Sequence, residues 1–321
     1  MGARHHDTRD TVVVAGRAGV YGRLLLAAAI VLTVVFGDLP GEGKYVGVLQ
    51  DGCHAPAFAA LALIALTQFR PRRLGPTIGM VVGLTVVGAG TEIVQGLIGR
   101  DRELDDVVSD FVGAAGMASL WLYVVWRGRT DRRATLGRAT AALACLGLAA
   151  YWATPLVRCG LGYWARDARF PVLAEFESTR DLYFVVTAPT PSHLVPVQQG
   201  ALALRVALDA GRWPGLTLTE PVADWRGFHE LLLDLENPGN APLALRLRIS
   251  DRAHSGAFED RFNSDVALAP LSRATVRFAL EAIATSPRDR RMDMSRIAQL
   301  MLFKAGAVAG QAVLVHRIWL Q

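Results

Sequence analysis

Polar residues gather where two apolar segments of the chain meet, in the stretch 91–116. Glu92 and Gln95 lie inside the end of the first segment, and Asp106 and Asp110 open the next one. Residues three or four apart share a helix face, so each pair should present its side chains together. A carboxylate so deep in an apolar segment is costly in lipid and normally faces a protein interior or a water-filled cavity. A short loop between two helices would bring both polar faces to one site.

A second polar pair, Asp51 and His54, stands at the head of an earlier apolar segment. The pair could handle protons or bind a head group, and Glu92 could carry a proton unless a cation such as Arg100 holds it ionised. The alternatives are structural: Asp51 could cap its helix, with His54 at the interface, and Glu92 could make an interhelical hydrogen bond. The catalytic candidates are therefore Glu92, His54 and Asp106, with no reaction assigned.

The remaining polar residues of this region leave further alternatives open. Arg100 and Arg102 could bind a lipid phosphate or an anionic sugar, because a guanidinium makes bidentate contacts, or could pair with neighbouring acids. Asp106 and Asp110 could simply complement a helix dipole. The acids and the histidine are metal-ligand types, but no compact motif such as HExxH requires an ion, and the sequence predicts no metal and no cofactor. GxSxG, Walker and GxGxxG motifs are absent from the sequence, so an enzymatic role stays open.

Five apolar segments in the first half are each near the ~20 residues that a membrane span needs. They are predicted over about residues 20–36, 53–69, 74–98, 107–126 and 136–154, after a loose polar tail over residues 1–16. Arginine clusters follow alternate segments, so the positive-inside rule places the N-terminus in the cytoplasm and stretches 51–54 and 92–110 at the outer face. The fifth segment, ending at Pro155, would deliver the remaining chain to the outside.

The second half alternates apolar and polar residues, as half-buried strands do. Strands are predicted over 173–177, 182–186, 201–208, 229–236, 243–250, 274–280, 298–305 and 312–320, with one helical turn at 292–299. About eight such runs without intervening helices favour a two-sheet sandwich or jelly roll.

These patterns predict a multi-domain chain: an all-α transmembrane bundle of about five spans, then an all-β sandwich outside the cytoplasm. The predicted parts are a cytoplasmic tail (1–19), a transmembrane domain (20–128), a basic loop with the fifth helix (129–158) and the sandwich (159–321). The net charge is +5, but the sequence lacks the stripe of basic and aromatic residues that nucleic-acid binding needs. The expected partners are a lipid bilayer and an envelope glycan or lipid-linked glycan, with no nucleic acid.

The ordered polar residues of the first half resemble the VanZ-like membrane family, named for a glycopeptide (teicoplanin) resistance protein. The matching positions are Asp51, His54, Glu92, Gln95, Arg100, Asp106, Asp110 and Gly113. The family usually has asparagine at the position of Asp110. The resemblance covers about residues 20–128. It implies an inner-membrane envelope protein with a link to glycopeptide tolerance, and it implies no established reaction.

The second half resembles the galactose-binding-like jelly roll of some carbohydrate-binding modules, through stretches 225–237, 245–251, 293–303 and 313–320. In such a module aromatic rings could stack on sugar faces, although each ring could equally be a core residue. The candidates are Trp213, Trp225, Phe228 and Trp319. The loop acids Asp251, Glu259, Asp260 and Asp265 could bind calcium or be merely solvated.

Three functional hypotheses follow. In the first, a polar outer-face pocket sits in a membrane bundle that tethers a glycan-binding domain. In the second, the chain is a membrane enzyme acting on an amphiphilic envelope substrate, with Glu92 and His54 as acid and base and Arg100 holding an anion. In the third, the sandwich binds protein and the chain is an envelope sensor or scaffold.

Overall fold

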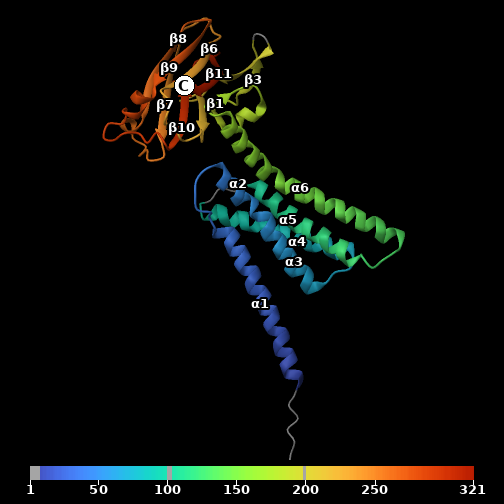
Figure 1. Ribbon diagram of the computed structural model, residues 1–321. Helices are drawn as coiled ribbons and strands as arrows, with labels where there is room; N and C mark the ends of the chain where they lie inside the picture. The colour runs from blue at the N-terminus through green and yellow to red at the C-terminus, as the bar shows by residue number, and fades with distance from the viewer. Residues whose placement is uncertain (1–7, 100–102, 198–199) are drawn as a thin grey trace, which may run out of the picture. The chain divides into compact units, whose positions relative to one another are not determined.

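The computed structural model describes residues 8–99, 103–197 and 200–321 (Figure 1), with side chains from residue 19 onwards. The chain divides into two compact units, Met1–Gly160 and Leu161–Gln321. The first unit is helical and the second contains two antiparallel sheets. The predicted fold class, a helix bundle followed by a β-sandwich, is therefore confirmed.

The helical unit contains segments long and apolar enough to cross a membrane. Its helices are α1 (Thr8–Phe36), α2 (Lys44–Gly52), α3 (His54–Phe69), α4 (Leu74–Leu97), α5 (Leu104–Val125) and α6 (Arg132–Arg169), whose last turns continue into the second unit. In the described part of the chain, five candidate spans meet these criteria, with α2 and α3 counted as one. A helix satisfies its own backbone hydrogen bonds, which is the condition for crossing lipid.

Three helix boundaries differ from the prediction. Helix α1 begins at Thr8, so residues 8–16 are helical and not a loose tail. The loop predicted after the first span contains the start of α2, which is too short and too polar to stand out as an apolar segment. Helix α6 continues past Pro155 to Arg169, because a proline removes one hydrogen bond and weakens a helix without necessarily ending it.

Helices α3, α4 and α5 lie side by side and form the centre of the bundle (Figure 1). Small residues let α3 and α5 approach closely, as is usual between helices in lipid. A Cβ atom added at Gly113 of α5 would lie 2.0 Å from the carbonyl oxygen of Ala55 in α3, so only glycine fits there. This contact fixes the start of α3 against the third turn of α5, about one turn after Asp110.

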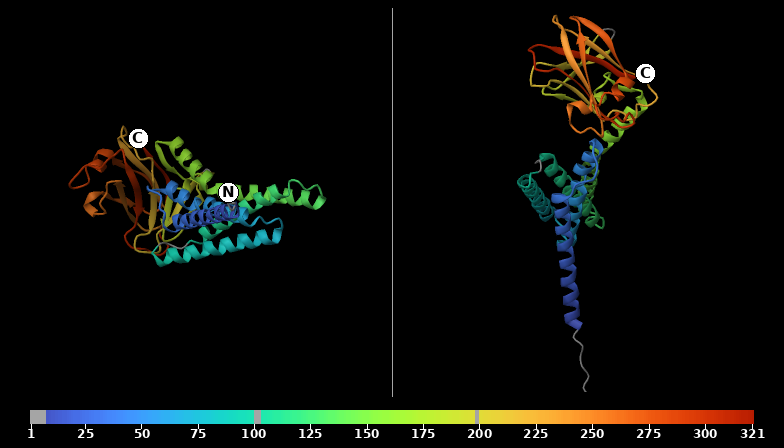
Figure 2. Two further views of the ribbon diagram at one scale, coloured as in Figure 1. Left: turned by 90° about the horizontal axis from the view of Figure 1, so that it is seen from below. Right: turned by 90° about the vertical axis from the view of Figure 1, so that its left-hand side faces the viewer.

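The β unit is a sandwich of two antiparallel sheets, shown from two further directions in Figure 2. Its strands are β1 (Val172–Glu175), β2 (Val185–Ala188), β3 (His193–Pro196), β4 (Leu202–Ala207), β5 (Gly215–Thr219), β6 (Glu230–Asn237), β7 (Leu243–Asp251), β8 (Phe262–Leu268), β9 (Ser272–Ala279), β10 (Ile297–Phe303) and β11 (Ala312–Leu320). One sheet has the order β3-β4-β11-β6-β9, with β1 paired to β11, and the other has the order β2-β5-β10-β7-β8. Buried side chains of both sheets, such as Leu233 and Leu247, share one core.

All eight predicted runs overlap a strand, but β3, β5 and β8 were not predicted. Strand β8 contains Asn263, Ser264 and Asp265, which interrupt the apolar alternation. The helical turn predicted at 292–299 is wrong. Met292 and Ile297 are both buried in the core, but residues from Ile297 onward form β10, and the short helix α7 lies earlier, at Leu280–Ala284.

Candidate functional site

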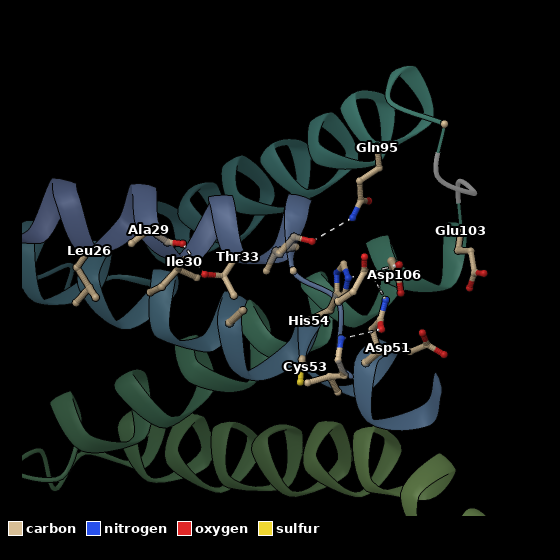
Figure 3. A pocket seen from close by; sticks show the side chains of 17 residues that line it. Leu26, Ala29, Ile30, Thr33, Asp51, Cys53, His54, Gln95, Glu103 and Asp106 are labelled. Carbon is tan, nitrogen blue, oxygen red and sulfur yellow. Dashed lines mark hydrogen bonds and ion pairs between the residues drawn. The ribbon is translucent and has the colours of Figure 1, made fainter. Parts of the chain in front are cut away.

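A pocket of about 810 Å³ opens in the helical unit (Figure 3). One wall is apolar and comes from α1; it contains Leu26, Ala29, Ile30 and Val34. The other end is polar and comes from α2 to α5; it contains Gln50, Asp51, His54, Gln95, Glu103 and Asp106. The described lining residues include no lysine or arginine. The pocket is therefore apolar along one side and acidic at one end.

His54 is the centre of the polar end. It lies in the first turn of α3 and is 7% exposed. Its Nδ1 is 3.1 Å from Oδ1 of Asp110, and its Nε2 is 3.5 Å from Oδ2 of Asp106. The two aspartates are four residues apart on α5, so they share a face and flank the two nitrogens of one imidazole.

Glu92, in the last turns of α4, is the third acid at this point and is 5% exposed. Its Oε2 accepts a hydrogen bond of 3.0 Å from the backbone N–H of Glu103. Its Oε1 is buried and has no hydrogen-bond partner among the described residues. Ligand atoms of His54, Glu92 and Asp106 all lie within 4.8 Å of one another, and a second, more exposed group joins Asp51, Glu103 and Asp106.

Two neighbours hold this cluster in place. The side-chain amide of Gln95 donates a hydrogen bond of 3.1 Å to the carbonyl oxygen of Val34, which ties α4 to α1. Gly88 of α4 makes room for Asp110, because a Cβ atom added there would lie 2.2 Å from Oδ2 of that carboxylate. Asp110 is completely buried, and only a glycine at position 88 leaves it space beside His54.

Two of the purely structural roles predicted from the sequence, a helix cap for Asp51 and a complement to the helix dipole for Asp110, have to be revised. Asp51 lies inside α2 and does not cap α3, whose N-cap residue is Cys53, with no side-chain cap. Asp110 is in the second turn of α5, where it contacts His54, so it is more than a complement to the helix dipole. Arg100 and Arg102 lie outside the described residues.

The four aromatic candidates of the β unit differ in exposure. Trp213 is 50% exposed, meets Phe303 edge-on and has the guanidinium of Arg212 over its ring. Phe228 and Trp319 are partly buried. Trp225 is fully buried in the core, and its indole N–H donates to the carbonyl oxygen of Val222 at 2.8 Å. Trp225 therefore offers no face to a sugar, and its proposal as a stacking residue was wrong.

Two of the loop acids of the β unit, Asp251 and Asp260, are held by Arg290, which is not among the predicted site residues. Arg290 donates to both carboxylate oxygens of Asp251, at 2.6 and 2.8 Å, and to Asp260 at 2.5 Å. Burial raises the pKa of Asp251, but Arg290 and the Asp293 N–H outweigh it and hold that pKa below its usual range. The Ser255 N–H and Arg290 lower the pKa of Asp260 to about 2. The carboxylates of Asp251 and Asp260 are thus paired with Arg290 and not free for calcium.

No protein-family model matches the chain, and no curated protein matches it. The VanZ-like resemblance therefore stays a prediction. Several solved structures match the C-terminal part of the chain. An exo-beta-agarase is 18% identical, with a TM-score of 0.39, over 47% of this chain and 24% of its own length. A family 11 carbohydrate-binding module from Clostridium thermocellum, in complex with a mixed-linked tetrasaccharide, is 14% identical, with a TM-score of 0.37, over 46% of this chain and 93% of its own. A carbohydrate-binding module specific for non-crystalline cellulose is 13% identical, with a TM-score of 0.34, over 47% of this chain and 93% of its own length. Sequence identities and TM-scores this low carry no conclusion about the function of the β unit.

Proposed function

We propose that the chain is an integral membrane protein of the cell envelope that binds an amphiphilic ligand in the pocket beside α1. The observation that supports this most directly is that one pocket combines the apolar α1 wall with His54 and Asp106, which form an acid–imidazole cluster with the buried Glu92. The proposed binding residues are Asp51, His54, Glu92, Gln95, Arg100, Asp106 and Asp110. The VanZ-like type, and with it a link to glycopeptide tolerance, belongs to this proposal and rests on the ordered motif alone.

The two sides of the pocket suggest the chemistry of the ligand. Leu26, Ile30 and Val34 would cover an acyl or isoprenoid chain, which gains free energy by leaving water. Ionised carboxylates only accept hydrogen bonds, so the head group must bring donors such as sugar hydroxyls or an amine. A lipid-linked glycan meets both conditions.

Binding can be tested on the full chain in nanodiscs that contain either a glycosyl diacylglycerol or phosphatidylcholine with the same acyl chains. Native mass spectrometry would count the retained lipids. We expect preferential retention of the glycolipid, at least about tenfold reduced in Ala29→Trp, because the new ring fills the pocket. Ala150→Trp, on the exposed surface of α6, is the matched control and should retain it. Equal retention of both lipids, or equal losses in both variants, would exclude this pocket.

The arginine pattern supports an orientation in which the N-terminus is cytoplasmic and the β unit lies outside the membrane. A green fluorescent protein fused to the C-terminus folds in the cytoplasm but not after export through the general secretion route. We therefore expect a full-length but dark fusion, and a fluorescent fusion after Gly128, which precedes the last span. The opposite pattern would reverse the orientation.

A second candidate function, glycan binding by the β unit, is favoured by Trp213. Its ring is half exposed and is oriented by its edge-on contact with Phe303, as a stacking surface requires. We expect full-length protein in nanodiscs to bind envelope polysaccharide and Trp213→Ala to weaken this by about tenfold. Trp164→Ala removes an equally polar, 70% exposed ring from α6 and should bind normally. Protein partners would become the better candidates if neither wild type nor control bound polysaccharide.

A further inference from the structure

We propose that His54, Glu92 and Asp106 together bind one divalent metal ion of the zinc class. The proposal concerns the polar end of the pocket alone and does not depend on the amphiphile. Three different helices, α3, α4 and α5, each contribute one ligand. An ion would therefore also tie the centre of the bundle together.

The geometry already approaches that of a metal site. Two ligand atoms on a tetrahedral Zn²⁺, each about 2.1 Å from the ion, are about 3.4 Å apart. Nε2 of His54 and Oδ2 of Asp106 are separated by 3.5 Å, and a Glu92 oxygen lies within 4.8 Å of a ligand atom of each of these two residues. The Glu92 carboxylate can approach the other two ligands by rotating its side chain. The set of one imidazole and two carboxylates suits Zn²⁺ better than Ca²⁺ or Mg²⁺, which prefer oxygen ligands alone.

The second nitrogen of His54 has the partner that metal-bound histidines usually have. Oδ1 of the fully buried Asp110 is 3.1 Å from Nδ1. A carboxylate in that position holds the proton on Nδ1, orients the ring and turns the lone pair of Nε2 towards the metal position. Gly88 leaves the space that Asp110 needs, so the orientation of His54 is fixed by two further residues.

An independent sign of a missing partner comes from the buried oxygens. Oε1 of Glu92 and Oδ1 of Asp106 are buried without a hydrogen-bond partner among the described residues. Glu92 is more than nine-tenths buried, and one of its carboxylate oxygens lies within 4.8 Å of ligand atoms of His54 and Asp106. A buried carboxylate left unpaired is costly, and a cation between the three side chains would give the Glu92 carboxylate a partner and balance the charge of Asp106.

Two other arrangements could compensate the same charge. His54 could be doubly protonated and form ion pairs with Asp106 and Asp110, or Arg100 could reach the acids. Neither would give the protein a stoichiometric affinity for metal. Metal binding therefore separates the three explanations.

The test uses the full chain in detergent, treated with a chelator that is then removed, and titrated with Co²⁺ and Zn²⁺ alone. We expect one Co²⁺ per chain, with visible absorption bands of a low-symmetry site containing an imidazole, and displacement by Zn²⁺. Asp110→Asn should weaken Zn²⁺ binding by about 10- to 100-fold, the usual effect of losing a residue that orients a ligand. His54→Gln, Glu92→Gln and Asp106→Asn should weaken it at least as much.

Asp105→Asn is the matched control, because this exposed acid neighbours Asp106 on α5 but belongs to neither candidate ligand group. It should bind Zn²⁺ as the wild type does. Thermal unfolding and gel filtration would show that each variant is folded. The proposal is overturned if folded wild type binds no stoichiometric metal, if Glu92→Gln and Asp106→Asn bind it normally, or if binding appears only after Arg100→Ala.

Discussion

Each unit of the molecule buries an aspartate completely, but the two aspartates have very different surroundings. Asp251 in the β unit is 2% exposed, and its oxygens accept two hydrogen bonds from Arg290 and one from the Asp293 N–H. Asp110 in the helical unit is 0% exposed, and its described partner is a single imidazole nitrogen. Its second oxygen, Oδ2, is buried without a hydrogen-bond partner among the described residues.

This difference separates a structural site from a functional one. A carboxylate saturated by a guanidinium and a backbone amide fixes a loop and has no capacity for another ligand. A cluster of acids around one histidine, inside an apolar bundle, is costly to keep, and such clusters normally serve binding or proton transfer. The polar pocket of the helical unit is therefore the better candidate for function, and the acidic loop of the β unit is the better candidate for stability.

The largest effect should come from breaking the saturated site. Arg290→Met leaves the Asp251 carboxylate buried without its cation, so we expect the β unit to lose about 3–5 kcal/mol of unfolding free energy. Urea-dependent pulse proteolysis of the intact chain, following fragments of the β unit, would measure this. Arg291→Met removes the neighbouring arginine, whose pair with Glu281 is exposed, and should leave the urea midpoint unchanged. Similar midpoints for both variants would show that Asp251 does not depend on Arg290.

In the helical unit, removing one charged side chain of the cluster should raise the stability instead of lowering it. Glu92→Gln keeps an acceptor for the Glu103 N–H but removes one negative charge near Asp106, so metal-free protein should gain on the order of 1–3 kcal/mol. The midpoint of thermal unfolding in detergent should rise for metal-free protein, and this variant should no longer be stabilised by Zn²⁺. A lower midpoint without metal would mean that Glu92 already has a cationic partner.

The next effect concerns the space that Gly88 leaves for Asp110. Gly88→Ala places a methyl group 2.2 Å from Oδ2 of Asp110, so the carboxylate must move away from His54, at a cost of about 1–3 kcal/mol. Gly83→Ala is the control on the same helix. A Cβ atom there meets nothing within 4 Å, and the change should stabilise α4 by up to about 1 kcal/mol. Equal thermal midpoints for both variants would show that Asp110 is not held against α4.

Much of this architecture can be predicted from the sequence. Long apolar segments indicate the spanning helices and period-2 alternation indicates the strands, because both patterns depend only on which side chains are buried. The segment around Glu92 and the head of α5 were recognisable, since carboxylates in apolar runs are rare. The structure adds what depends on packing. The start of α3 against α5 is set by Gly113 and Ala55, and the spacing of motifs along the chain does not reveal such a contact.

The partner of each buried acid was the least predictable feature. Arg290 stands in the basic run 288–291, where nothing distinguishes it from its neighbours until β7 and the loop before β10 bring it to Asp251. Trp225 is of a residue type that often stacks on sugars, but the sandwich buries its side chain completely. In both cases the decisive information is the pairing of strands distant in sequence.

The smallest effect is a dependence of the β unit on acid pH. The folded-state pKa values of Asp251 and Asp260 lie below the ~3.9 of an unfolded aspartate. The two carboxylates therefore stabilise the folded β unit fully above about pH 4. This contribution declines as the pH falls towards 2, because the unfolded state takes up protons first. Urea midpoints measured between pH 4 and pH 2 with pepsin as the pulse protease should fall. The fall should be shallower in Arg290→Met, because the guanidinium that lowers both pKa values is gone. A wild-type midpoint that stays constant over this range would contradict the account of Asp251 as a site stabilised by its ion pair.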